Sequence, residues 1–262
     1  MSNLNKFCFV GVSTSEGALG KNKGCELAPT YLSELFSVQL KQINLSKNDV
    51  ELQQKEIFDE SLKVLSECEG KKVVFFGGTH DITFSTFKAF SKLNVDSSIL
   101  IFDAHSDCDE GLSTPTHEDF VRALVEQKIV PAGKIMLFGL RKIYPSEKDF
   151  LKTSGVKQIY LEDFEKNKEK VFKEFNEFVS NSKNLYLSFD VDVLDSNIMQ
   201  ATGYVHKGGL TVPQAKKYFS FGLEKATALD IVEFNPKKIK LKENKILTNI
   251  FNEFVVEEKA VN

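Results

Sequence analysis

The sequence predicts an α/β fold of three layers, in which helices cover both faces of a mostly parallel central sheet. Short apolar runs recur along the 262 residues, and segments of helical spacing lie between them. This alternation is typical of parallel strands joined by crossover helices. Most of the runs are apolar at every position, as expected of strands that are buried on both faces. Because no Gly/Ser/Pro-rich linker or internal repeat interrupts the pattern, we expect one domain over residues 1–262.

Seven apolar runs are the expected strands. In chain order they are Phe7–Val12, Lys72–Phe76, Ser98–Asp103, Lys134–Phe138, Lys157–Tyr160, Leu185–Asp190 and Ala226–Val232. Between them, apolar residues at helical spacing indicate helices, for example at Phe84, Phe87 and Phe90, at Phe120, Ala123 and Leu124, and at Phe172, Phe175 and Phe178. After the last strand, the charged segment Lys237–Lys245 is expected to lead into a final helix. The apolar face of that helix should dock on the sheet through Ile246, Leu247, Ile250, Phe251 and Phe254.

Composition excludes several classes of partner and location. The chain has 34 Lys and Arg against 37 Asp and Glu, for a formal net charge of -3, so no positive excess is present to attract nucleic acid or an anionic membrane surface. No apolar run approaches the ~18 residues of a membrane span, and the first residues do not resemble a signal peptide. We therefore expect a cytoplasmic protein. The four cysteines, Cys8, Cys25, Cys68 and Cys108, are far apart, and we expect them to be reduced thiols.

Ionisable residues stand where four of the expected strands end, and the clearest group lies at 103–107. It reads Asp103-Ala104-His105-Ser106-Asp107 and directly follows the apolar run at 99–102. Three ligand-type side chains at alternate positions point to one side of the chain. Two carboxylates at the end of a buried strand do not stabilise a fold by themselves, so the group indicates metal binding. A capped helix start or a solvated turn is the alternative interpretation.

A second acidic group follows a later strand. Asp190 and Asp192 share one face by the period of two, and like carboxylates side by side repel each other unless a cation lies between them. A solvated acidic turn is the alternative. His80 follows the turn-forming Gly77-Gly78, and Glu233 stands at another strand end. Each of these two, taken alone, is also compatible with a structural histidine or a surface acid.

Together, these residues fit a site for a pair of hard divalent ions. Carboxylate oxygens can bridge two ions while imidazoles fill other positions. Two ions about 3.5–4 Å apart can generate a hydroxide nucleophile at neutral pH. Four ligand aspartates and one hydroxide outweigh the charge of two divalent ions, so a cationic substrate suits such a site better than a phosphate does.

The motifs resemble those of the ureohydrolase family, which comprises arginases, agmatinases and formimidoylglutamases. GGTH (77–80), DAHSD (103–107), SFDVDVLD (188–195) and EFNP (233–236) stand in the order of that family's motifs. The opening Val10-Gly11-Val12 with the glycines after it, and Ala201-Thr202-Gly203 before GGLT (208–211), are similar to further family segments. The resemblance covers nearly the whole chain and implies the arginase-like form of the three-layer fold.

The resemblance also implies roles for individual residues. One manganese ion would be held by His80, Asp103, Asp107 and Asp190, and a second by Asp103, His105, Asp190 and Asp192. Asp103 and Asp190 then bridge the two ions. The implied catalytic residues are His117, Glu233 and Asp107. His117 stands close to the family's proton-shuttling histidine, with a surface residue at a helix start as the alternative, and Glu233 would accept paired hydrogen bonds from a guanidinium.

The implied activity is hydrolysis of the C–N bond of a linear amidine. Metal-hydroxide attack on a guanidino compound, agmatine- or arginine-like, would release urea and an amine. Two alternatives stay open: a formimidoylglutamase-like hydrolase of a formimidoyl amide, because DVLDSNIM (192–199) departs from the arginase form, and a metal-binding family member without catalysis. The family resemblance also implies a homo-oligomer, trimeric or hexameric.

Several positions depart from the family pattern. Thr79 replaces the usual Asp before the first histidine, and Tyr204 and His206 replace small residues in the loop after SFDVDVLD.

Asp109 stands where arginases usually carry an Asn that serves the substrate's carboxylate, and Pro115 replaces a second such Asn. At about 4 Å and an effective dielectric near 20, a carboxylate facing Asp109 would be repelled by roughly 4 kcal/mol. The sequence therefore favours a substrate with a cationic or neutral tail. The alternatives are a solvated loop acid or a contact between Asp109 and an α-ammonium.

Overall fold

Eight parallel strands form one sheet in the computed structural model, which describes residues 3–46 and 49–254. The strands are β1 (Phe7–Val12), β2 (Leu40–Ile43), β3 (Lys72–Gly77), β4 (Ser97–Phe102), β5 (Ile135–Leu140), β6 (Lys157–Tyr160), β7 (Asn184–Asp190) and β8 (Ala226–Val232). Across the sheet they run in the order β2-β1-β3-β8-β7-β4-β5-β6, and every neighbouring pair is parallel. The predicted fold class is confirmed.

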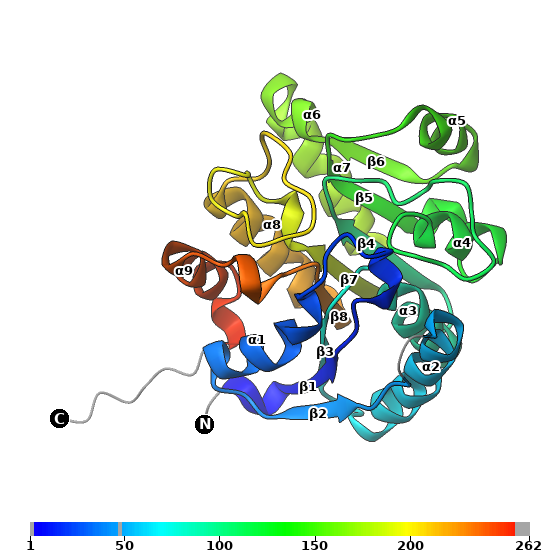
Figure 1. The fold of residues 1–262 in the computed structure, drawn as a ribbon. Helices are drawn as coiled ribbons and strands as arrows, with labels where there is room; N and C mark the ends of the chain where they lie inside the picture. Colours follow the sequence, from blue (N-terminus) through cyan, green and yellow to red (C-terminus); the bar gives the residue numbers. More distant parts are fainter. Residues whose placement is uncertain (1–2, 47–48, 255–262) are drawn as a thin grey trace.

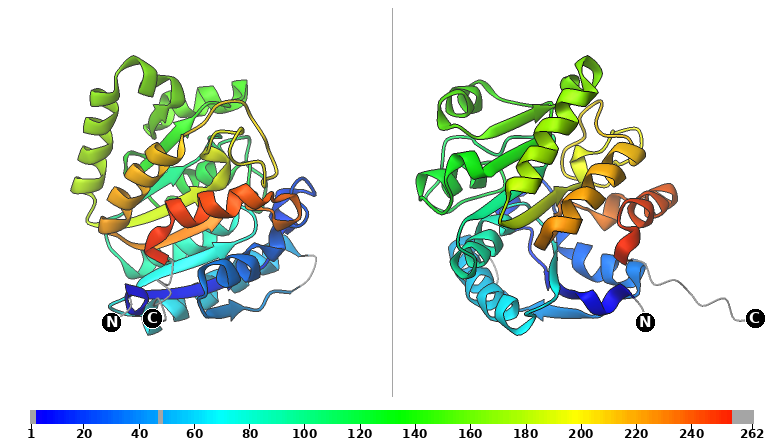
Figure 2. Two further views of the ribbon diagram at one scale, coloured as in Figure 1. Left: turned by 90° about the vertical axis from the view of Figure 1, so that its left-hand side faces the viewer. Right: turned by 180° about the vertical axis from the view of Figure 1, so that it is seen from behind.

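Helices cover both faces of this sheet. Within the described residues they are α1 (Ala28–Phe36), α2 (Val50–Glu67), α3 (Ile82–Leu93), α4 (Phe120–Glu126), α5 (Pro145–Ser154), α6 (Leu161–Lys166), α7 (Lys168–Asn181), α8 (Val212–Lys225) and α9 (Leu241–Ile250). In Figure 1, α1, α8 and α9 lie on one side of the strands, and α2, α3 and α4 lie on the other. The left view of Figure 2 shows α1, α7, α8 and α9 lying across the strands. None of the helices described is both long and apolar enough to cross a membrane.

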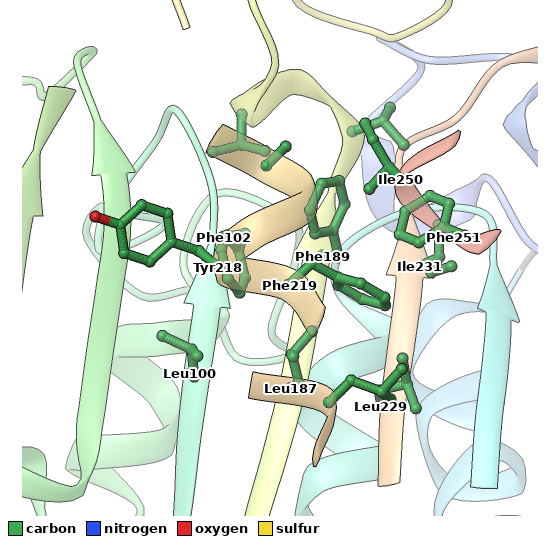
Figure 3. Close-up of a cluster of buried hydrophobic side chains, with 14 of the residues drawn as sticks. Leu100, Phe102, Leu187, Phe189, Tyr218, Phe219, Leu229, Ile231, Ile250 and Phe251 are labelled. Atoms are coloured by element: carbon green, nitrogen blue, oxygen red, sulfur yellow. The ribbon is translucent and has the colours of Figure 1, made fainter. Parts of the chain in front are cut away.

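Each face of the sheet buries its own apolar cluster. In β4, Leu100 belongs to one cluster and the next residue, Ile101, belongs to the other, as the period of two requires. Figure 3 shows part of the first cluster, in which Tyr218 and Phe219 of α8 and Phe251 after α9 pack against side chains of β4, β7 and β8. Full burial of such a side chain contributes about 1.5–3 kcal/mol. The central strands are therefore firmly held between two packed layers.

Two elements differ from the sequence prediction. The edge strand β2 is absent from that prediction, because its exposed Lys41 and Gln42 leave no apolar run. The final helix α9 begins at Leu241, so the second half of the charged segment, up to Lys245, lies inside the helix, and only Lys237–Lys240 precede it. Its apolar side does pack on the sheet as expected, since Leu247 and the residues after it belong to the core.

The expectation of four reduced cysteines is wrong for two of them. Cys8 in β1 and Cys68, directly after α2, form a disulfide across 60 residues of sequence. No sequence pattern indicates this pair, because the fold alone brings their Cα atoms to 6.2 Å, within the range that a disulfide spans. Cys25 and Cys108 are free and buried.

The four central strands position the ionisable residues of the sequence motifs. β3, β8, β7 and β4 are consecutive neighbours, and because all of them are parallel, their carboxyl ends meet at one edge of the sheet. In open parallel sheets, ligands bind outside the carboxyl ends of the strands, where the strand order reverses. The carboxyl ends of these four strands and the loops after them carry all four of the motifs identified in the sequence.

Candidate active site

Two groups of potential metal ligands lie at this edge and share one aspartate. The groups are His80, Asp103 and Asp107, and Asp103, His105 and Asp192, with the ligand atoms of each group within 4.8 Å of one another. His80 Nδ1 lies 3.0 Å from Asp103 Oδ2 and 3.1 Å from Asp107 Oδ2. The other carboxylate oxygen, Asp103 Oδ1, lies 3.4 Å from His105 Nδ1. Asp103 therefore presents one oxygen to each group.

The end of β7 supplies the remaining ligands. Asp190 Oδ2 lies 3.5 Å from His80 Nδ1, and Asp192 Oδ2 lies 2.9 Å from His105 Nδ1. Backbone amides fix both carboxylates: the Asp192 amide donates to Asp190 Oδ1 at 2.7 Å, and the Ala104 amide donates to Asp192 Oδ1 at 3.1 Å. The structure thus brings together all six residues that the sequence predicts as metal ligands.

The surroundings of His80 direct a ring nitrogen toward the carboxylates. His80 Nε2 lies 2.9 Å from Ser188 Oγ, which in turn donates to Asp230 Oδ1 at 2.5 Å. Because Ser188 uses its hydroxyl hydrogen on Asp230, it can only accept from His80, and a proton is held on Nε2. Nδ1 is buried and has no hydrogen-bond partner among the described residues. A nitrogen of this kind, facing three carboxylates, suits a metal ligand.

Ser188 and Asp230 support His80, a role that the sequence analysis did not assign to either residue. Asp230 is fully buried, and it also accepts hydrogen bonds from Thr83 Oγ1 and Tyr186 Oη, both at 2.8 Å. The available signal was a polar residue inside an apolar strand, in LYLSFD (185–190) and in ALDIV (228–232). Ser188 and Asp230 are also paired in register between β7 and β8, which no sequence pattern shows.

Thr79, which departs from the family pattern, contacts Asp81 and not the ring of His80. Its hydroxyl donates to Asp81 Oδ1, and Asp81 Oδ2 accepts from Gln54 Nε2 at 2.7 Å. Burial raises the pKa of Asp81 to about 6. The ring of His80 is therefore oriented by Ser188 and not by residue 79.

Replacing Ser188 with alanine is expected to weaken metal binding about 10–100-fold, because His80 loses the hydroxyl that fixes its ring. Calorimetric titration of the chelator-treated protein with Mn²⁺ measures the change. Ser98→Ala is a matched control, since it removes a buried hydroxyl from β4 that has no partner among the described residues. Equal affinities in the two variants would contradict the role of Ser188.

In the absence of a metal, this cluster holds protons. Burial, together with the charge of Asp103, raises the pKa of Asp107 to about 8, and burial with neighbouring charges raises the pKa of Asp190 well above its usual range. Burial opposes the charged forms of His80 and His105, but the carboxylates around them outweigh it and raise both pKa values. Divalent ions would displace these protons. Four carboxylates and two imidazoles are a donor set that suits Mn²⁺.

His117 and Glu233 form a second pair beside the ligands. His117 Nδ1 lies 3.3 Å from Glu233 Oε1, which also accepts from the His80 amide at 2.9 Å, while Glu233 Oε2 accepts from Asn22 Nδ2 at 2.7 Å. Burial disfavours both charges, but the pairing raises the pKa of His117 and lowers the pKa of Glu233. His117 is buried, in contrast to the alternative of a surface residue. The pairing therefore favours the charged forms, an imidazolium beside a carboxylate.

Two residues of the site adopt left-handed backbone conformations. Asp107 has φ +49° and Glu233 has φ +62°, values that non-glycine residues rarely take up. Such conformations cost of order 1–3 kcal/mol and gather at functional sites. The surrounding fold therefore maintains this arrangement against a local conformational cost.

A cavity of about 250 Å³ connects these groups with the surrounding loops. Besides the histidines and carboxylates already described, it is lined by Lys21, Asp109, Glu118, Tyr144, Glu147 and Tyr204. Asp109 and Tyr204 are the two of these that the sequence analysis identified. Asp109 Oδ1 accepts from Ser146 Oγ at 2.9 Å. The size suits a small molecule and lies below the volumes typical of drug-sized ligands.

Comparisons with known proteins identify similar sequences. A model of the Arginase family matches residues 5–254. Hepatic arginase of Aquarana catesbeiana is 29% identical over 194 residues, which cover 64% of this chain and 59% of that protein. The match thus spans less than two thirds of the length of that relative.

Solved structures show the same fold. The formimidoylglutamase of Bacillus subtilis subsp. subtilis str. 168 superposes with a TM-score of 0.86 at 18% identity, covering 95% of this chain and 85% of that one. The agmatine ureohydrolase of Thermoplasma volcanium superposes with a TM-score of 0.82 at 22% identity, covering 96% and 89%. At these identities the likeness concerns the fold alone.

Proposed function

This chain belongs to the arginase family, and on that premise we propose that it is a manganese-dependent hydrolase that converts a guanidino compound to urea and an amine. One observation carries the proposal: two ligand groups share Asp103, and His117 and Glu233 lie in the same cavity. A metal-binding protein without catalysis would have no need of the second pair.

The six clustered residues would hold the two ions as the family resemblance assigns them. One site would comprise His80, Asp103, Asp107 and Asp190, and the other Asp103, His105, Asp190 and Asp192. Bound divalent ions supply Lewis acidity and lower the pKa of water. Backbone amides hold the carboxylates of Asp190 and Asp192 in place, and Ser188 orients the ring of His80.

Glu233 would bind the amidinium end of the substrate. A carboxylate offers about four lone-pair directions, and three are used by the His80 amide, His117 and Asn22. The remaining direction, on Oε2, supports one charge-assisted hydrogen bond from a guanidinium N–H. This differs from the paired hydrogen bonds expected from the sequence, because Asn22 and His117 lie far from Glu233 in the chain and the sequence gives no sign of their contacts.

His117 would protonate the departing amine. Its Nδ1–H is directed to Glu233, and its Nε2 is buried without a hydrogen-bond partner among the described residues. The pairing with Glu233 raises the pKa of His117 and so favours the protonated ring, in which Nε2 carries the proton to be donated. His117→Ala is expected to lower kcat roughly 10²–10⁴-fold while the bound manganese, measured by metal analysis, stays the same. Loss of metal in this variant would show instead that His117 is a ligand.

The activity itself is tested by product release. The manganese-loaded protein is incubated with a panel of guanidino and formimidoyl compounds, and urea, ammonia and formamide are measured. Urea from a guanidino compound is the expected result. Formamide from a formimidoyl compound, without urea from any guanidino compound, would favour the formimidoyl alternative. No product from any compound, with two ions bound, would favour a family member without catalysis.

A further inference from the structure

Lys21 is a cation in an otherwise acidic cavity. It lies in the loop between β1 and α1 and is the only lysine or arginine among the described residues that line the cavity, alongside seven aspartates and glutamates. Its side chain is 44% exposed. Long lysine side chains on a surface usually extend into solvent because ordering them costs rotamer entropy, so a lysine held over a cavity calls for an explanation.

Residues from two other loops hold Lys21 in place. Its Nζ forms an ion pair with Glu118 Oε1, from the loop before α4, and lies 5.9 Å from the ring centre of Tyr204, from the loop after β7. Tyr204 Oη donates to the same Glu118 oxygen at 3.2 Å. The hydrogen bond with Glu118 raises the pKa of Lys21, so the amine is an ammonium at any physiological pH. We call Lys21, Glu118 and Tyr204 the mouth cluster.

The ring of Tyr204 connects the mouth cluster with the candidate reaction centre. The Tyr204 ring is 5.4 Å from the ring of His105 and 5.8 Å from the ring of His117. Lys21 lies on the same Tyr204 ring. A substrate with its amidino carbon beside His105 and His117 would therefore extend past Tyr204 and present its far end to Lys21.

We propose that Lys21 binds a carboxylate at the far end of the substrate, so that the chain acts on guanidino acids in preference to guanidino amines. The inference rests on the proposed function and narrows its substrate class. An ammonium has three N–H donors, of which Glu118 takes one, and Glu118 and Tyr204 orient the rest. A guanidino acid would then place its cationic end near Glu233 and its anionic end at Lys21. The anionic tail selected in this way is the opposite of the cationic or neutral tail that Asp109 alone predicts.

The test compares two substrates that differ in the charge of their tail: 4-guanidinobutanoate, with a carboxylate, and agmatine, with an amine. We expect the wild type to show at least a tenfold higher kcat/KM for the acid. Lys21→Met should lower kcat/KM for the acid at least tenfold, mainly through KM, and should leave agmatine unchanged or improved. Lys21→Arg should recover part of the loss. Lys23→Met removes an exposed lysine of the same loop that does not line the cavity, and it should behave as the wild type does.

A double variant separates binding by Lys21 from simple neutralisation of Glu118. Lys21→Met alone leaves the negative charge of Glu118 unpaired, and Glu118→Gln removes that charge. If the kcat/KM for the acid is still low in the double variant, the result supports a direct contact between Lys21 and the substrate carboxylate. Recovery of the wild-type preference in the double variant would overturn the proposal. A wild type that prefers agmatine would overturn it as well.

Binding of the tail alone distinguishes this inference from the proposed function. The calorimetric affinities of 4-aminobutanoate and 1,4-diaminobutane for the manganese-loaded protein are measured in the wild type and in Lys21→Met. Tighter binding of the acid that Lys21→Met abolishes supports the inference even if no urea forms, in which case only the proposed function fails. Urea formation without any Lys21-dependent preference in binding or kcat/KM would overturn the inference alone.

Discussion

Replacement of Asp103 by alanine should reduce bound manganese to at most one ion and lower the hydrolytic rate about 10³-fold or more. Asp103 presents one oxygen to His80 and the other to His105, so its loss removes a ligand from both groups. Metal ions stabilise developing charge by several kcal/mol, and each ~1.4 kcal/mol corresponds to a tenfold change in rate. Metal analysis after manganese loading and desalting, together with kcat for urea release, measures both effects.

Matched variants make this result specific. Asp149→Ala makes the same substitution at an exposed position of α5 and should retain two ions and full activity. Asp190→Ala, at the second proposed bridge, should also lose at least one ion and its activity. Circular dichroism checks that each variant is folded. Two bound ions in folded Asp103→Ala would contradict the assignment of Asp103 as a bridge.

Removal of the metal should lower the melting temperature by about 10 °C at pH 8.5 and by less at pH 6. A ligand present at a thousand times its dissociation constant stabilises a fold by about 4 kcal/mol, and for a chain of this size each kcal/mol corresponds to roughly 2–4 °C. Scanning calorimetry of manganese-loaded and chelator-treated protein at the two pH values gives the difference directly.

The sign of the pH effect follows from the protons in the cluster. The pKa of Asp107 is about 8 in the metal-free folded protein against 3.8 for an ordinary aspartate, so between those values the folded state binds a proton that the unfolded chain has released. Stability of the metal-free protein therefore falls as pH rises toward 8. The raised pKa values of His80 and His105 act in the same direction, since their stabilisation is present below pH 6.5 and is lost as pH rises. Manganese binding improves over the same range. A stabilisation by manganese that is larger at pH 6 than at pH 8.5 would contradict this account.

Much of the candidate site was predictable because its residues follow buried strands. Asp103, His105 and Asp107 directly follow the apolar run of β4, and Asp190 ends β7. An apolar run fixes where a strand ends, and the parallel arrangement brings those ends to one edge. The ligands after β4 and β7 were therefore visible from local patterns, whereas His80 was assigned only through the resemblance of the motifs, in their order, to those of a known family.

The supporting residues were not predictable because their roles depend on contacts between distant segments. Asn22 bonds to Glu233 across 211 residues, and Ser188 bonds to Asp230 across 42. Lys21 lies in a loop with no periodic pattern, and only the position of Glu118 and Tyr204 shows where its ammonium is held. The edge strand β2 was not predicted because a half-exposed strand has few apolar residues to mark it in the sequence.

The position of β8 in the sheet has a consequence for how the protein is made on the ribosome. β8 is the last strand in the chain, yet it lies between β3 and β7 in the middle of the sheet. At about 5–20 residues per second, several seconds of translation separate the end of β7 from the end of β8. During that time the nascent chain can assemble β2-β1-β3 and β7-β4-β5-β6 only as two separate pieces, each with an unpaired edge.

Unpaired edges are templates for pairing with other chains, so a ribosome that stalls before Ala226 would expose two of them. The same delay affects the metal. Asp103 directly follows β4 and Asp190 ends the adjacent strand β7, whereas His80 follows β3 on the far side of β8. A growing chain can therefore gather Asp103, His105 and Asp190 early, but it gains His80 only when synthesis of the last strand closes the sheet.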